Sequence, residues 1–314
     1  MSKPRAFWSE AFSLLGSAGG RVWPITLSFG AFSVFIYLLY LYYYPNLTLE
    51  VGPHEVGGVV LSLLLVVRTN AGYDRWWEAR KLWGGIVNQS RNLALLGLAH
   101  GPADERWRAA LVHRIAAFAW TAKARLRGET EVPRLIPLLG ASEASRVEAM
   151  EHPPSWLALQ IDILLRDACE RKGGMDRMAF LQAERERTAL IDHLGGCERI
   201  RSTPLAQAYS ITIRRFILIY LLTLPFALLH KFEAEWVAPL VTVVIAYAVL
   251  MLDQLGIELQ QPFSVRNLNH LPLDDICRTI EDNLLALLRQ TSGYSATAFV
   301  ESGSGKRGSR NGPG

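Results

Sequence analysis

Val59, Leu63 and Val67 are three apolar residues at regular spacing, and this spacing could give them a chemical role. Intervals of four residues place them along one stripe of a helix. Several copies of the stripe around an axis would form three stacked apolar rings, and hydrophobic constrictions of this kind gate ions by dewetting. Ordinary helix packing also produces apolar stripes, and it does so more often. A gate and a packing face therefore both stay open at this point.

A dense polar and aromatic segment, residues 68–80, follows the stripe directly. Its centre is Arg75, Trp76, Trp77 and Glu78. Tryptophan rings can stack on guanidinium groups, and acidic and basic side chains at helical spacing can pair. A collar that anchors a helix at a membrane interface would have this composition. We therefore expect a structural role for the segment rather than a catalytic one.

Four apolar blocks would have to position these residues. They are Val22–Leu49, Val56–Val67, Phe216–His230 and Trp236–Leu252. A helix that faces lipid needs about 20 apolar residues to span the hydrocarbon, and only the first block exceeds that length. Short blocks are tolerated where protein or water covers the backbone. No proline occurs between Pro53 and Pro102, so we expect the second block to continue as one long helix from membrane into water. The second apolar block is too short for a helix that faces lipid, so it must be covered by protein or line a water-filled path. This points toward a pore.

The pattern predicts an all-α membrane protein, folded as a single domain over 1–314. We expect membrane helices at about 22–46, 54–74, 209–230 and 236–256, and cytoplasmic helices within about 75–208 and 257–292. Apolar residues recur at helical spacing in 105–127, 153–172 and 175–194, which is typical of amphipathic helices. The low-complexity end, SGSGKRGSRNGPG (302–314), predicts a disordered tail.

The distribution of lysine and arginine predicts how the chain crosses the membrane. Basic residues flank the inner ends of the blocks, whereas the two short outer connections are acidic. The basic residues are Lys3, Arg5, Arg21, Arg68, Arg75, Arg80, Lys81, Arg214 and Arg215, and the acidic ones are Glu50, Glu55, Glu233 and Glu235. Because positive flanks stay in the cytoplasm, we expect both termini and the large 68–208 region to be cytoplasmic.

Composition argues against several other classes of protein. The net charge is +4, but the basic residues lie beside apolar blocks, which is typical of membrane flanks rather than of nucleic-acid binding. Cys169, Cys197 and Cys277 are far apart, so we expect reduced thiols and neither a disulfide framework nor a zinc site. The seven histidines are scattered, and no catalytic or phosphate-binding motif occurs. We expect no enzyme activity, cofactor or metal.

Several segments resemble those of a known family. RTNAGYDRWWEARKLWGGIVNQSRNLA (68–94) resembles the signature of bacterial bestrophin-like proteins, as do RVWP (21–24), CERIRSTPLAQAY (197–209) and PFSVRNLNHLPLDDICRTIEDNLLALL (262–288). The likeness extends from Arg21 to about Leu288. RWWEAR and NHLPLDDICRTIEDNL are its most specific parts, and Pro262 and Phe263 open the last segment.

The resemblance implies an ion channel. Bestrophins are all-helical pentamers with a central pore, so a homopentamer with four membrane helices per subunit and a cytoplasmic helical region is expected. The second membrane helix would line a neck. Counting back from the RWW motif places that neck at Val59, Leu63 and Val67, the stripe already found by spacing. Neck residues in the family are typically Ile and Phe, so valine at two positions implies a wider constriction. A further narrow aperture would fall within 180–190.

The resemblance also implies partners and a location, but it leaves the sign of the permeant ion open. We expect membrane lipids, permeant monovalent ions and a bacterial inner (plasma) membrane. Animal members conduct anions such as chloride, while some bacterial members conduct monovalent cations. Acidic outer loops would concentrate cations, and basic cytoplasmic flanks would do the opposite. A non-conducting membrane scaffold or sensor, whose cytoplasmic helices bind a soluble partner, is the alternative.

One departure from the animal members concerns calcium. Those proteins carry a run of acidic residues just after a Pro-Phe pair. Here Pro262 and Phe263 are followed by SVRNLNH, with Arg266 where an acidic residue would be needed. Hard cations such as calcium prefer carboxylate oxygen ligands. We therefore expect no calcium-dependent gating of that kind.

Overall fold

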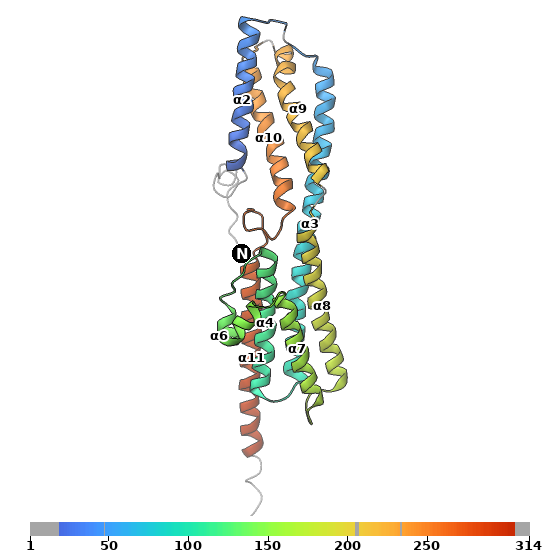
Figure 1. The fold of residues 1–314 in the computed structure, drawn as a ribbon, viewed down its shortest axis with the longest axis vertical. Coiled ribbons are helices and arrows are strands. Elements are labelled where there is room, and N and C mark those ends of the chain that lie inside the picture. The colour runs from blue at the N-terminus through green and yellow to red at the C-terminus, as the bar shows by residue number, and fades with distance from the viewer. Residues whose placement is uncertain (1–18, 47, 205–206, 233, 305–314) are drawn as a thin grey trace, which may run out of the picture. The chain divides into compact units, whose positions relative to one another are not determined.

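The computed structural model describes residues 19–46, 48–204, 207–232 and 234–304, and within them all regular secondary structure is helical (Figure 1). The chain divides into two compact units. Unit 1 comprises residues 1–78 and 202–270, and unit 2 comprises 79–201 and 271–314. The all-helical expectation is confirmed for the described residues.

Four helices of the described chain are long and apolar enough to cross a membrane. They are α2 (Gly19–Tyr42), α3 (Val51–His100), α9 (Gln207–Lys231) and α10 (Val237–Leu259). α2 ends earlier than the expected residue 46, just before Pro45, which cannot continue a helix. α3 begins at Val51 and accommodates Pro53 in its first turn, where a missing N–H removes no helical hydrogen bond.

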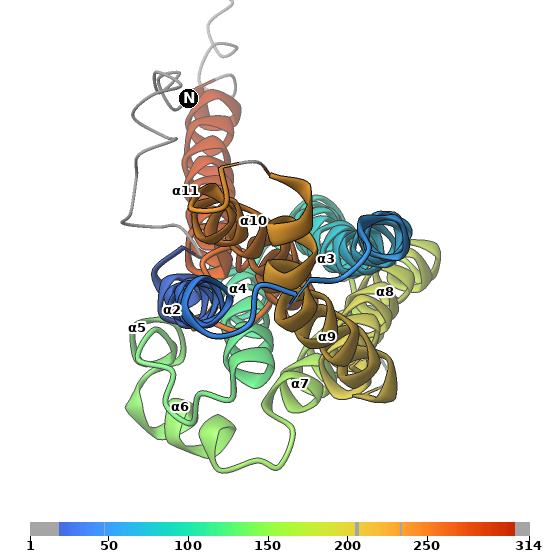
Figure 2. The same cartoon turned by 90° about the horizontal axis from the view of Figure 1, so that it is seen from above.

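The core of unit 1 is built from apolar side chains of these helices. α2 packs on α10, and α9 packs on both of them (Figures 1 and 2). Leu61 and Leu65 of α3 join the buried cluster that Ile213, Ile217 and Leu221 form on α9. A buried polar group costs free energy unless it is paired, and one pair of hydroxyls in this interior meets that requirement. The buried hydroxyls of Ser33 and Thr242 lie 3.1 Å apart between α2 and α10.

Unit 2 is a bundle around α4 (Glu105–Arg127). The unit also contains residues 79–100 of α3, together with α5 (Leu135–Leu139), α6 (Ala141–Glu148), α7 (Pro153–Glu170), α8 (Arg177–Ser202) and α11 (Leu273–Ser304). Asp104 caps the start of α4 by accepting from the backbone N–H of Arg106, and Gly128 ends it in the left-handed conformation. α4 packs on α5, α7 and α11.

The burial of α4 differs from a simple amphipathic pattern. Every residue from Ile115 to Ala124 is buried, so this stretch has no solvent-facing side. Alanines fill most of the positions that a single apolar stripe would leave outside, which allows neighbouring helices to approach from several directions. The expected tail at 302–314 lies beyond the described residues from 305 onward, whereas 302–304 belong to α11.

Candidate functional site

The stripe of Val59, Leu63 and Val67 lies on a face of α3 that no other part of the described chain covers. The exposed fractions of these residues are 62%, 62% and 57%. Leu61, Leu65 and Arg68 lie on the opposite side of the helix and are almost fully buried. α3 therefore has two distinct faces over its first turns: one that builds the protomer, and one that is left free.

A buried ion pair lies next to the Val67 end of the stripe, on the opposite side of α3. The guanidinium of Arg68, whose residue is 1% exposed, donates to the carboxylate of Asp253 on α10. The second carboxylate oxygen of Asp253 lies 3.5 Å from Nε of Arg214 on α9. An ionised side chain at membrane depth is costly unless it is paired. This pair therefore fixes α3 to α10 and orients Arg68 away from the free face.

The close approach of α3 to α10 depends on two glycines. A Cβ added at Gly72 would lie 3.0 Å from the carbonyl oxygen of Gly256 and 3.1 Å from Cβ of Leu259. A Cβ added at Gly256 would lie 3.4 Å from Cγ of Arg68. Small residues at a crossing let helix backbones approach closely. The glycines thus make room for the arginine stem beside the backbone of α10.

The ion pair and the crossing are features that sequence reasoning missed. The sequence places Arg68 in a polar and aromatic segment, and it places Arg214 and Arg215 among the basic residues that flank the apolar blocks. The signal was Asp253, an acidic residue directly after the fourth apolar block, Trp236–Leu252. An acid and a base at the ends of neighbouring membrane helices can be expected to meet.

The Arg75–Glu78 segment of α3 contacts the backbone that precedes α9 and the backbone that follows α10. The guanidinium of Arg75 donates to the backbone carbonyl of Thr203 at 2.8 Å and to that of Gln260 at 3.4 Å. The indole N–H of Trp76 donates to the carbonyl of Asn269 at 2.8 Å. Trp77 is half-exposed, and Glu78 is partly buried. These contacts within unit 1 agree with a structural role for the segment.

Pro262 and Phe263 are buried at the start of the segment that follows α10. The carboxylate of Glu258, which is fully buried, accepts from the side-chain amides of Gln254 and Asn269 at 3.3 and 3.2 Å. Arg21 approaches the same carboxylate at 3.6 Å. Arg21 also donates to the backbone carbonyl of Arg266 at 2.6 Å. Polar side chains thus satisfy this irregular backbone.

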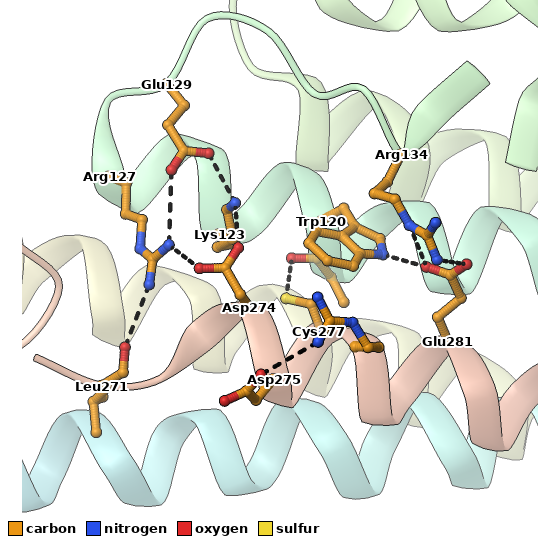
Figure 3. Close-up of polar contacts among 12 residues, drawn as sticks. Trp120, Lys123, Arg127, Glu129, Arg134, Leu271, Asp274, Asp275, Cys277 and Glu281 are labelled. Carbon is orange, nitrogen blue, oxygen red and sulfur yellow. Dashed lines mark hydrogen bonds and ion pairs between the residues drawn. The ribbon is translucent and has the colours of Figure 1, made fainter. Parts of the chain in front are cut away.

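In unit 2, a second polar cluster joins α11 to α4 (Figure 3). The carboxylate of Asp274 accepts from Lys123 at 2.9 Å and from Arg127, and Glu129 pairs with Lys123 at 3.0 Å. Burial alone would raise the pKa of Asp274, but the hydrogen bonds from Lys123 and Arg127 outweigh it and lower that pKa to about 2. The cluster is an internal set of ion pairs.

A second group of contacts lies about two turns further along α11. The buried carboxylate of Glu281 accepts from the indole N–H of Trp120 at 2.7 Å and from Arg134 at 2.7 Å (Figure 3). Cys277 lies between the two groups of contacts, and burial raises the pKa of its thiol.

Cys169, Cys197 and Cys277 are free thiols in the described structure. Across the described residues, no three or more His, Cys, Asp or Glu side chains gather as metal ligands would.

Comparisons with known proteins point to one family. Residues 1–286 match the family described as Bacterial/Fungal Bestrophin protein. A voltage-dependent anion channel-forming protein of Nostoc sp. (strain PCC 7120) is 32% identical over 289 residues, which cover 90% of this chain and 92% of that protein. The voltage-dependent anion channel-forming protein YneE of Escherichia coli (strain K12) is 31% identical over 295 residues, covering 91% and 93% of the two chains.

A solved structure agrees with the sequence comparisons. The crystal structure of a bacterial bestrophin homologue from Klebsiella pneumoniae superposes with a TM-score of 0.78 at 29% sequence identity. The match covers 84% of this chain and 97% of that one. Similarity therefore extends over the helices that carry the stripe, the buried ion pair and the polar cluster.

Proposed function

The chain belongs to the bacterial and fungal bestrophin family, and on that premise we propose that it is a passive ion channel. It is a membrane protein, with four helices suited to span a bilayer. Five copies would surround a central axis, with α3 of each facing the pore. The relatives described above are named anion channels, and we propose anion conduction for this chain by the same class of mechanism.

The observation that carries this proposal is the free apolar face of α3. Val59, Leu63 and Val67 contribute nothing to the core of the protomer, and they are followed immediately by a buried arginine. In a pentamer the stripe would form three apolar rings around the axis. Water leaves a narrow apolar passage easily, and a dry passage blocks ions. We therefore propose that these residues form the gate, or neck, of the pore.

The proposal extends to topology. Basic residues flank the inner ends of the membrane helices, so unit 2 and both termini would lie in the cytoplasm and the connections 43–50 and 232–236 outside. In a bacterial cell the membrane would be the inner one. The Arg75–Glu78 segment, Pro262 and Phe263 would then support the inner end of the neck through the contacts described above.

The experiment measures single-channel currents of the purified protein in planar bilayers. The variant Val59→Ala/Leu63→Ala/Val67→Ala should raise the conductance by at least about twofold, because smaller side chains widen the three apolar rings and make it easier for water and ions to enter them. Val244→Ala on α10 is the matched control, since Val244 is likewise 62% exposed but lies on a different helix.

The outcomes separate the alternatives. A larger conductance in the triple variant and an unchanged one in Val244→Ala support the neck. Equal effects of both substitutions would contradict the assignment of the neck to this stripe. If wild type and triple variant are both silent although they assemble as pentamers of the 35.1 kDa chain, the protein is a scaffold or sensor and not a channel.

A further inference from the structure

The free face of α3 continues beyond the neck. Exposed residues follow one another at intervals of three and four along the helix, which keeps them on a single face. They are Val56, Val59, Leu63, Val67, Asn70, Asp74 and Trp77. All of them belong to unit 1. In the assembled protein, Asn70 and Asp74 therefore point to the same side of α3 as the first four residues.

The character of this face changes after Val67. Its next two members are an amide, Asn70, and a carboxylate, Asp74. Asp74 is the only charged residue among the seven. At a rise of about 1.5 Å per residue it lies roughly 10 Å beyond Val67 along the helix axis. A permeating ion that leaves the apolar rings on the inner side would therefore meet a carboxylate next.

No cation neutralises Asp74 within the described part of the chain, where it forms neither an ion pair nor a hydrogen bond. Arg68 is buried against Asp253 on the other side of α3. Arg75 directs its guanidinium to the carbonyls of Thr203 and Gln260. The helix thus separates these charges: Arg68 and Arg75 are held by the protomer, and Asp74 is left on the free face.

From this separation we infer that Asp74 tempers the anion preference proposed above: its carboxylate favours cations and opposes anions, and so raises the permeability of cations relative to anions. The inference rests on the pentameric channel proposed above. Five copies would place five carboxylates in one ring at the inner end of the neck. Rings of acidic side chains attract cations and repel anions, and an apolar wall beside them strengthens the field.

The ring acts as an electrostatic filter and not as a tight binding site. Asp74 is exposed, so water hydrates its carboxylate and a passing ion keeps much of its own hydration. Screening by salt then sets the distance over which the charge of the ring acts. The Debye length is about 10 Å at 0.1 M salt and about 3 Å at 1 M. Selectivity that depends on Asp74 must therefore weaken as the salt concentration rises.

The test is the reversal potential under a KCl gradient for the full-length protein in planar bilayers. In Asp74→Asn, the permeability of potassium relative to chloride should fall by at least about threefold near 0.1 M salt. The same substitution should have a smaller effect near about 1 M salt, where the charge is screened. Asp74→Glu keeps the charge on the same face and should retain the wild-type ratio.

A matched control removes a carboxylate elsewhere. Glu170 is exposed at the end of α7 and forms no ion pair in the described structure, so Glu170→Gln should leave the reversal potential unchanged. An Asp74→Asn channel that conducts with the wild-type ratio overturns the inference while leaving the channel intact. So does a shift of equal size at both salt concentrations, since screening would then play no part. Absence of current in every protein, wild type included, would instead overturn the channel proposal.

Discussion

The stability of this protomer depends on the buried side chain of Arg68. Replacing it with Met would leave Asp253 at membrane depth with only Arg214, 3.5 Å away, as a partner. Breaking one side of a buried pair typically costs about 3–5 kcal/mol. We expect Arg68→Met to lower the melting temperature of the detergent-purified protein by about 5 °C or more, as measured by tryptophan fluorescence.

A double substitution distinguishes loss of the pair from damage to packing. Arg68→Met/Asp253→Leu removes both buried charges and should recover most of the lost stability, since no buried ion is left unpaired and the side chain of Arg214 is 60% exposed. Arg278→Gln is the control, because Arg278 forms an exposed pair with Asp275 at 3.5 Å and such pairs contribute about 0–1 kcal/mol. The melting temperature of the double variant could instead fall by the sum of the decreases in the two single variants. That result would show that the charges do not hold α3 to α10.

Asp274 makes the stability of unit 2 depend on pH in a defined direction. Its pKa is lowered from 3.8 to about 2 in the folded protein. A lowered carboxyl pKa means that the stabilising ion pairs are fully present above the unfolded pKa and are lost as the pH falls through the folded pKa. Thermal unfolding of wild type and Asp274→Asn should therefore differ by a constant amount above about pH 5, and the difference should shrink toward pH 2. A difference that grows on acidification would contradict the assignment.

The crossing of α3 and α10 is the feature that matters most at the level of elements. A side chain at Gly72 would meet the backbone of Gly256 and Cβ of Leu259 within 3.1 Å. We expect Gly72→Val to destabilise the protein by about 1–3 kcal/mol, because rigid backbone on the facing helix cannot yield. Gly195→Ala is the comparison, since a Cβ there meets nothing within 4 Å. Equal melting temperatures for the two variants would show that the helices separate without cost.

The helices themselves could be predicted well from the sequence. The continuous helix α3 follows from the absence of proline after Pro53, and the predicted 105–127 segment coincides with α4. The all-round burial of α4 could not be predicted, because periodicity within one segment does not reveal that α5, α7 and α11 surround it. The partners of Arg68 and Asp274 were missed for the same reason, since each lies more than a hundred residues away along the chain.

At the scale of the whole molecule, the family and its membrane helices were within reach of the sequence. RWWEAR and NHLPLDDICRTIEDNL carried the resemblance, and the match over residues 1–286 confirms it. The neck at Val59, Leu63 and Val67 stays a prediction. A single protomer leaves these residues free, as a pore requires, but the axis around which they would gather exists only in an assembly.

The two faces of α3 have a consequence for how such a channel can evolve. Mutations on the buried face, at Leu61, Leu65 or Arg68, are constrained by the folding of the protomer. Mutations at Val59, Leu63 or Asp74 meet a weaker constraint, because these residues are exposed in the protomer and lie outside its buried core. If these residues line the pore as proposed, conductance and ion preference can change without loss of folding. A lineage could retune its permeation one residue at a time while every intermediate still folds.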